Sequence, residues 1–210
     1  MDTVPNGVIA KDANVHHSST IVDVVLIVAG TQMSEEKENK ILFLDVDGVI
    51  ATHRSFIAYG YEKYLFDPSC CYCILNMMLE CGFTKIVLSS TWRYIPDGWE
   101  KFKEKLGIAC PELVDYLYPD DDDKRMSVGD GYVEKSPSIL GWLDKYEESE
   151  NVVDFLILDD DSIIKHNYKP EYEYLADHFH KIVNGSEGFG ASDWYRILKD
   201  FPRFFHKSLT

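Results

Sequence analysis

The sequence predicts an α/β fold: a doubly wound, mainly parallel sheet with helices on both faces. Four short apolar runs follow one another from Lys40 onward, and segments with helical patterning separate them; the runs are ILFLDVDGVI, KIVLSST, DFLILDDD and HKIVNGS. Continuous apolar strands that alternate with helices are typical of a parallel sheet covered on both sides. Three of the runs also end in polar residues. Because the carboxyl ends of parallel strands open onto one crevice, these residues are expected to meet.

Helices are expected between the strands, where apolar residues recur at helical spacing. Ser136 with Pro137, and Ser192 with Asp193, are suitable helix starts. The expected helices run from about Pro68 to Cys81, Trp99 to Leu106, Ser136 to Glu148, Tyr172 to His178 and Ser192 to Phe201.

The length of 210 residues fits one domain with a tail. Residues 1–39 are expected to form a flexible N-terminal tail with a candidate edge strand at 21–29, and residues 40–210 to form the domain. The apolar run from Ile21 to Gly30 is about half as long as a membrane helix and contains Asp23, so no membrane-spanning segment is expected.

The composition restricts the partners. Lys and Arg number 21 against 36 Asp and Glu, which gives a formal charge of −15. Such a surface repels a phosphate backbone, so strong nonspecific nucleic-acid binding is not expected. The five cysteines are odd in number and lack the spacing of a zinc site. Buried free thiols and a reducing compartment such as the cytoplasm fit them.

The first polar strand end is FLDVDG, in which Asp45 and Asp47 follow the apolar residues 41–44. Two carboxylates separated by one residue both reach the crevice once the chain leaves the strand, and Gly48 permits the turn there. A DxDG turn is also common as a plain solvated loop, so its meaning depends on the other strand ends.

The remaining polar residues have the chemistry of phosphoryl transfer. Ser89 or Ser90 ends the second strand and offers a hydroxyl and backbone N–H groups to a phosphoryl oxygen. The run Asp159 to Asp161 ends the third strand, and neighbouring acids repel one another unless a cation such as Mg²⁺ neutralises them. Lys135 precedes a helix, where its charge could hold both phosphate and the Asp45 carboxylate.

In this order, hhhhDxDG, hhhS, a lysine before a helix and hhhDD resemble the haloacid dehalogenase (HAD) superfamily over about residues 40–201. The pieces SSTWR and GFGASD look especially like its small members with minimal or no cap, the HAD domains associated with Swiss Army Knife RNA repair-like proteins. The resemblance implies a Rossmann-like fold and a Mg²⁺-dependent phosphatase.

The resemblance also implies a role for each residue. Asp45 is the expected nucleophile that forms an aspartyl-phosphate, and Asp47 the expected general acid and base. Ser89, or less readily Ser90, would bind a phosphoryl oxygen, and Lys135 would stabilise the transferred charge. The metal ligands would be Asp45, the backbone carbonyl of Asp47, and an acid of the 159–161 run; Asp160 and Asp159 are preferred to Asp161.

Substrate choice is less determined. The segments that follow Asp47 and Lys135 are short, so the site is expected to be open, with HRSFIAYGYEKY read as a loop beside it. By analogy of fold, an open site would admit a nucleotide, a nucleic-acid end or a phosphoprotein. Two alternatives stay open: a small-molecule phosphatase or 5′-nucleotidase, and a noncatalytic phosphate- or partner-binding module.

Two pairs of residues near the expected site can be interpreted either as substrate contacts or as ordinary structural residues. Trp92 and Arg93 could contact substrate by stacking and by charge, and Arg93 is taken as a candidate substrate-binding residue. The other reading is a packed tryptophan beside a solvated arginine. His53 and Arg54 could lie over the phosphate or belong to an ordinary surface loop.

Overall fold

The fold is seen in a computed structural model, which describes residues 37–60, 63, 65–119, 123–125, 134–162 and 170–205. These residues all belong to the compact unit 36–210. The expected tail, with its candidate edge strand at 21–29, lies outside the described residues except for 37–39.

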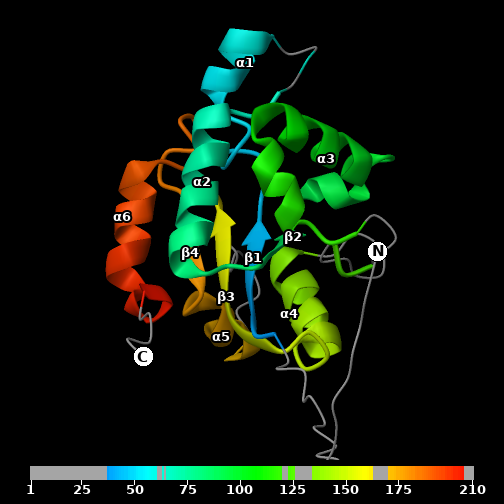
Figure 1. Ribbon diagram of the computed structural model, residues 1–210, viewed down its shortest axis with the longest axis vertical. Coiled ribbons are helices and arrows are strands. Elements are labelled where there is room, and N and C mark those ends of the chain that lie inside the picture. The colour runs from blue at the N-terminus through cyan, green and yellow to red at the C-terminus, as the bar shows by residue number, and fades with distance from the viewer. Residues whose placement is uncertain are drawn as a thin grey trace, which may run out of the picture. The chain divides into compact units, whose positions relative to one another are not determined.

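The sheet has four parallel strands in the order β2-β1-β3-β4 (Figure 1). Each overlaps one of the four apolar runs: β1 is Asn39–Leu44, β2 Lys85–Leu88, β3 Val152–Asp159 and β4 Phe179–Lys181. The predicted parallel α/β fold is confirmed. Continuous apolar sequence suits these strands because both faces of the sheet are covered.

The expected helices are present with small shifts at their ends. Helix α2 begins at Pro68, after the N-cap Asp67, and ends at Cys81 before Gly82, whose left-handed conformation ends the helix. The other α-helices that follow it are α3 (Gly98–Ala109), α4 (Lys135–Tyr146), α5 (Glu173–Ala176) and α6 (Ala191–Asp200). The short 3₁₀ helices are η1 (Thr91–Tyr94), η2 (Pro111–Tyr116), η3 (Asp123–Arg125), η4 (Pro170–Tyr172) and η5 (Pro202–Phe205).

Side chains of β1 alternate between two hydrophobic cores. Leu42 and Leu44 belong to the core under α2, α3 and α6, whereas Ile41 and Phe43 belong to the core under α4 and α5. Phe43 is fully buried and packs edge-on against Trp142 of α4, with ring centroids 5.3 Å apart. The central strand is therefore held between two helical layers.

The segment HRSFIAYGYEKY was predicted to be a loop, and this prediction is wrong for its first part. Residues His53–Tyr59 form helix α1, which lies beyond the carboxyl ends of the strands (Figure 1). Thr52 caps its start in a reciprocal capping box with Ser55. These two hydroxyls, three residues apart, are the local signal that sequence reasoning missed.

The five cysteines are free, and four of them are buried, as expected. Within the described residues, no helix is both long and apolar enough to cross a membrane.

Replacing Phe43 with alanine is expected to lower the free energy of unfolding by about 3–5 kcal/mol, because it empties a filled site between the sheet and α4. Urea unfolding followed by circular dichroism measures the change. Ile108→Ala, at a side chain that is 59% exposed, is the control and should cost less than about 0.5 kcal/mol. Equal losses in the two variants would contradict this account of the core.

Candidate active site

Three neighbouring strands, β2, β1 and β3, have their carboxyl ends side by side, and the residues there form one layer across the sheet. Leu44 of β1 pairs with Leu88 of β2 and with Leu158 of β3. The next residues along these strands are Asp45, Ser89 and Asp159, and backbone hydrogen bonds continue there: Ser89 N donates to Leu44 O at 2.9 Å and Asp45 N to Leu158 O at 3.0 Å. The parallel register thus brings together residues that lie far apart in the sequence.

Lys135, the first residue of α4, joins the two acids of this layer. Its Nζ lies 2.8 Å from Asp45 Oδ2 and 2.5 Å from Asp159 Oδ2. Burial alone would lower the pKa of Lys135, but the attraction of Asp45 and Asp159 outweighs it, so the pKa is raised. The lysine therefore stays charged and offsets part of the negative charge around it.

One ammonium group does not neutralise the acids fully. Carboxylate oxygens of Asp45, Asp159 and Asp160 lie within 4.8 Å of one another. Burial, and then repulsion by Asp45, raises the pKa of Asp159 to about 7 and also raises that of Asp160. A compact set of oxygen ligands with excess negative charge can hold a metal ion, and hard divalent cations prefer such ligands.

Two glycines leave room for Asp160. Gly48 has φ +72°, and a Cβ added there would overlap the Asp160 carboxylate. A Cβ at Gly185 would come within 2.7 Å of Asp160 Oδ2. Glycine is therefore required at both turns for the backbone to approach this acid closely.

A cavity of about 450 Å³ opens beside Asp160. Its walls come from the turn after β1, from α1 and from the loop after β4; they include Asp47, Gly48, Ala51, His53, Phe56, Asp160, Gly185 and Ser186. Two acids, Asp47 and Asp160, and the exposed His53 thus face the same space.

The two serines after β2 differ in their surroundings. Ser89 Oγ is buried and, within the described part of the chain, has no hydrogen-bond partner. Ser90 Oγ accepts a hydrogen bond from Trp92 N at 3.4 Å and caps η1. A buried hydroxyl without a partner is costly, so Ser89 has the stronger physical need for a ligand.

Trp92 and Arg93 both point inward. Trp92 is 6% exposed and packs against Phe66, with ring centroids 5.5 Å apart. Arg93 is 8% exposed, and its guanidinium donates to the backbone carbonyls of Ser89 and Ser90. The tryptophan is therefore packed, as one reading had it, while the arginine is buried instead of solvated.

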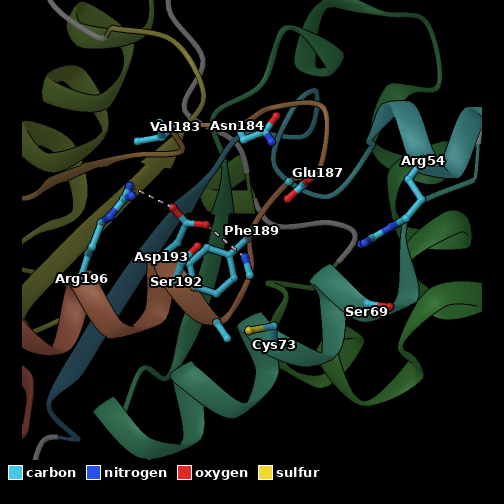
Figure 2. A pocket seen from close by; sticks show the side chains of 13 residues that line it. Arg54, Ser69, Cys73, Val183, Asn184, Glu187, Phe189, Ser192, Asp193 and Arg196 are labelled. Carbon is cyan, nitrogen blue, oxygen red and sulfur yellow. Dashed lines mark hydrogen bonds and ion pairs between the residues drawn. The ribbon is translucent and has the colours of Figure 1, made fainter.

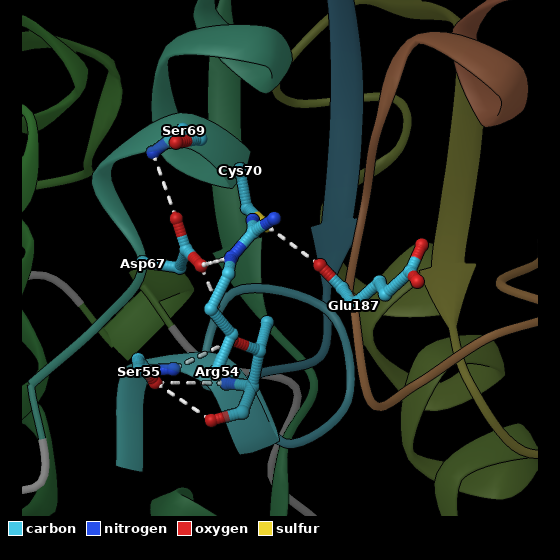
Figure 3. Close-up of polar contacts among 7 residues, drawn as sticks. Arg54, Ser55, Asp67, Ser69, Cys70 and Glu187 are labelled. Atoms are coloured by element: carbon cyan, nitrogen blue, oxygen red, sulfur yellow. Dashed lines mark hydrogen bonds and ion pairs between the residues drawn. The ribbon is translucent and has the colours of Figure 1, made fainter. Parts of the chain in front are cut away.

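A polar network holds the start of α1 against α2 and the loop after β4 (Figure 3). Arg54 Nε donates to Asp67 Oδ2 at 2.7 Å, and Thr52 Oγ1 donates to the same oxygen. Asp67 Oδ1 accepts from Ser69 N, while Cys70 Sγ donates to Glu187 O at 3.3 Å. Sequence reasoning missed this network, which fixes the base of α1 beside the site.

A second cavity, of about 390 Å³, lies at the start of α6 (Figure 2). The loop after β4 lines both cavities. Arg54 and Arg196 reach this cavity from α1 and α6, but each already contacts a carboxylate: Arg54 that of Asp67, and Arg196 that of Asp193 at 3.8 Å.

A parallel sheet whose central strand leads into DxDG, with a lysine and further acids gathered at its carboxyl edge, defines a domain of the HAD superfamily. Residues 41–192, more than half of the chain, match the family model of the HAD domain in Swiss Army Knife RNA repair proteins. The chain belongs to this family, and the resemblance inferred from its motifs is confirmed. No curated protein and no solved structure matches the chain.

Replacing Asp67 with asparagine is expected to destabilise the protein by about 1–2 kcal/mol at pH 7, because the N-cap of α2 and the ion pair with Arg54 are both weakened. Burial opposes the charge of Asp67, but hydrogen bonds from Arg54 and from Ser69 N outweigh it and lower the pKa. The stabilisation is therefore present above about pH 4 and is lost as the pH falls through the lowered pKa of the folded state.

Urea unfolding of both proteins at pH 7 and pH 3 measures this difference. Asp97→Asn is a matched control, because Asp97 is the N-cap of α3 but makes no side-chain capping bond. A difference between wild type and Asp67→Asn that grows toward acid pH would contradict the account.

Proposed function

We propose that this domain is a Mg²⁺-dependent phosphomonoester hydrolase that acts through an aspartyl-phosphate on Asp45. The observation that carries the proposal is the layer of Asp45, Ser89 and Asp159 at neighbouring strand ends, with Lys135 bonded to both acids. Membership of the HAD family supports it. The reaction divides one difficult displacement into two easier ones.

In the first step a carboxylate oxygen of Asp45 attacks phosphorus, the bond from phosphorus to the leaving oxygen breaks, and Asp47 gives that oxygen a proton. In the second step Asp47 takes a proton from water as the water attacks phosphorus. The bond to Asp45 then breaks, which releases inorganic phosphate and restores the carboxylate.

Ser89 and Lys135 are proposed to hold the phosphoryl group. The buried, unpartnered hydroxyl of Ser89 can donate to a phosphoryl oxygen, and N–H groups at Ser89 and Ser90 can add to it. The Lys135 ammonium, already beside Asp45, would stabilise the charge on the transferring group.

Magnesium is the proposed metal, held by Asp45, the backbone carbonyl of Asp47 and an acid after β3. Asp160 is the stronger choice, since it faces the cavity that Asp47 also lines. Both oxygens of Asp159 already have partners, in Lys135 Nζ and Asp161 N. The ion would screen the charge of the phosphate from the nucleophile.

A phosphorylated nucleic-acid end is the proposed substrate, and two observations support it. The family is that of a domain in RNA repair proteins. The cavity beside Asp160 is bounded on one side by the short helix α1, which leaves room for a bulky leaving group. The free thiols are consistent with a cytoplasmic setting.

Asp45→Asn should abolish hydrolysis of an aryl phosphate in Mg²⁺, because the amide is a poor nucleophile. EDTA should do the same, and excess Mg²⁺ should restore the rate. Asp47→Asn should lower kcat by about 10²–10⁴-fold through loss of proton transfer. Release of the aryl alcohol, followed by absorbance, measures each rate.

Asp161→Asn is the matched control, because Asp161 belongs to the same acidic run but is exposed, and it should keep most of the activity. Turnover that survives both Asp45→Asn and EDTA would contradict the mechanism. Comparison of oligonucleotides phosphorylated at either end, free nucleotides and phosphopeptides then decides the substrate class. Preference for free nucleotides would favour a 5′-nucleotidase instead.

Mg²⁺ should raise the melting temperature of the wild type, because the ion binds only the gathered acids of the folded state. At about 100 times the Kd, the gain is roughly 2.7 kcal/mol. Asp160→Asn should lose this gain and be more stable than wild type without metal, since burial and then repulsion by Asp45 both oppose the charge of Asp160 and raise its pKa. Scanning calorimetry measures both; an unchanged Mg²⁺ response in the variant would contradict a role for Asp160.

A further inference from the structure

Arg93 lies at the junction of two parts of the site. It belongs to η1, which follows β2 after Ser89 and Ser90, and its guanidinium carbon lies 4.6 Å from the centroid of the Tyr94 ring. Nη1 donates to Ser89 O at 2.5 Å and to Ser90 O at 2.9 Å. Nη2 donates to Ser138 Oγ of α4 at 3.3 Å.

These bonds connect the two groups that are proposed to hold phosphate. Ser89 carries the unpartnered hydroxyl at the end of β2. Ser138 lies three residues after Lys135 in α4, so both side chains project from the same face of the helix. Arg93 therefore spans from the strand end with the phosphate-binding serine to the helix turn with the lysine.

The chemistry of the guanidinium suits it to this task. Its planar donors have fixed directions, so bonds to the carbonyls of Ser89 and Ser90 and to the hydroxyl of Ser138 fix the relative positions of these three residues. A buried cation is costly unless its donors are satisfied, and the bonds from Nη1 and Nη2 offset part of that cost. At 8% exposure, little of the side chain is free to meet a substrate.

We propose that Arg93 is a positioning residue, which holds Ser89 and Lys135 at the separation that the transferring phosphoryl group requires. The inference rests on the proposed function and extends it. Because Arg93 acts through Ser89, Ser90 and Ser138, it assists the transition state without itself contacting the substrate.

Ser138→Ala tests the connection at its α4 end. The helix should still form, since Ser138 N keeps its bond to Glu134 O at 3.2 Å. The expected result is a fall in kcat for an aryl phosphate of about fivefold, the value of one hydrogen bond, with KM nearly unchanged. The melting temperature should fall slightly, because a buried donor of Arg93 loses its partner and the bond from Ser138 Oγ to Glu134 O is also removed. Ser149→Ala, which removes a serine-to-carbonyl bond at the far end of the same helix, should leave kcat unchanged.

Arg93→Lys keeps the charge but cannot make the three bonds together, and kcat should fall by about 100-fold. The double variant Arg93→Lys/Ser138→Ala should be no slower than Arg93→Lys alone, because both changes break the same connection between β2 and α4. Unchanged kcat in Ser138→Ala, losses that multiply in the double variant, or a raised KM with unchanged kcat in Arg93→Lys would each overturn the proposal. Should Arg93→Lys fail to fold, Ser138→Ala decides alone.

Calorimetric binding of orthovanadate, an analogue of five-coordinate phosphorus, separates this proposal from the proposed function because it needs no turnover. In Mg²⁺, Ser138→Ala should bind vanadate about fivefold more weakly than wild type. Equal vanadate binding would overturn the positioning role. A wild type that binds vanadate but hydrolyses no phosphomonoester would contradict the proposed function and leave the vanadate comparison as the test of Arg93.

Discussion

The contact of Lys135 with Asp45 and Asp159 is the interaction on which the site depends. The parallel register places two buried carboxylates on neighbouring strands, where burial and mutual repulsion oppose their charge. A cation at the first position of a helix is itself unfavourable, because the helix dipole is positive there. The attraction of the two acids outweighs that cost and brings the start of α4 to the edge of the sheet.

The acids nonetheless exceed the available positive charge. Burial, and then repulsion by Asp45, raises the pKa of Asp159 and that of Asp160, and a divalent ion would relieve the repulsion. Stability and the proposed function are therefore opposed in the absence of metal, because the carboxylates that are proposed to serve phosphoryl transfer also repel one another and weaken the folded state. A net charge of −15 over the whole chain adds to this opposition and does nothing to attract a polyanion from a distance.

Groups without a chemical role surround the site and set its geometry. Gly48 and Gly185 allow the backbone to approach Asp160, and Asp67 ties the start of α1 to α2. Arg93 joins the end of β2 to α4. Each is a small or buried residue whose effect passes through its neighbours, and such residues hold the elements of the site in place.

The sequence by itself determined the four strands, most helices and the order of the acids, serines and lysine, because apolar runs and helix caps are local signals. The tertiary structure decided what depends on contacts across the fold. Ser89 and Ser90 look alike in sequence, and only packing shows which hydroxyl lacks a partner. Arg93 bonds to Ser138, which lies 45 positions further along the chain, and a contact between residues so far apart produces no local pattern in the sequence. Short helices such as α1 likewise owe their stability to tertiary contacts more than to local propensity.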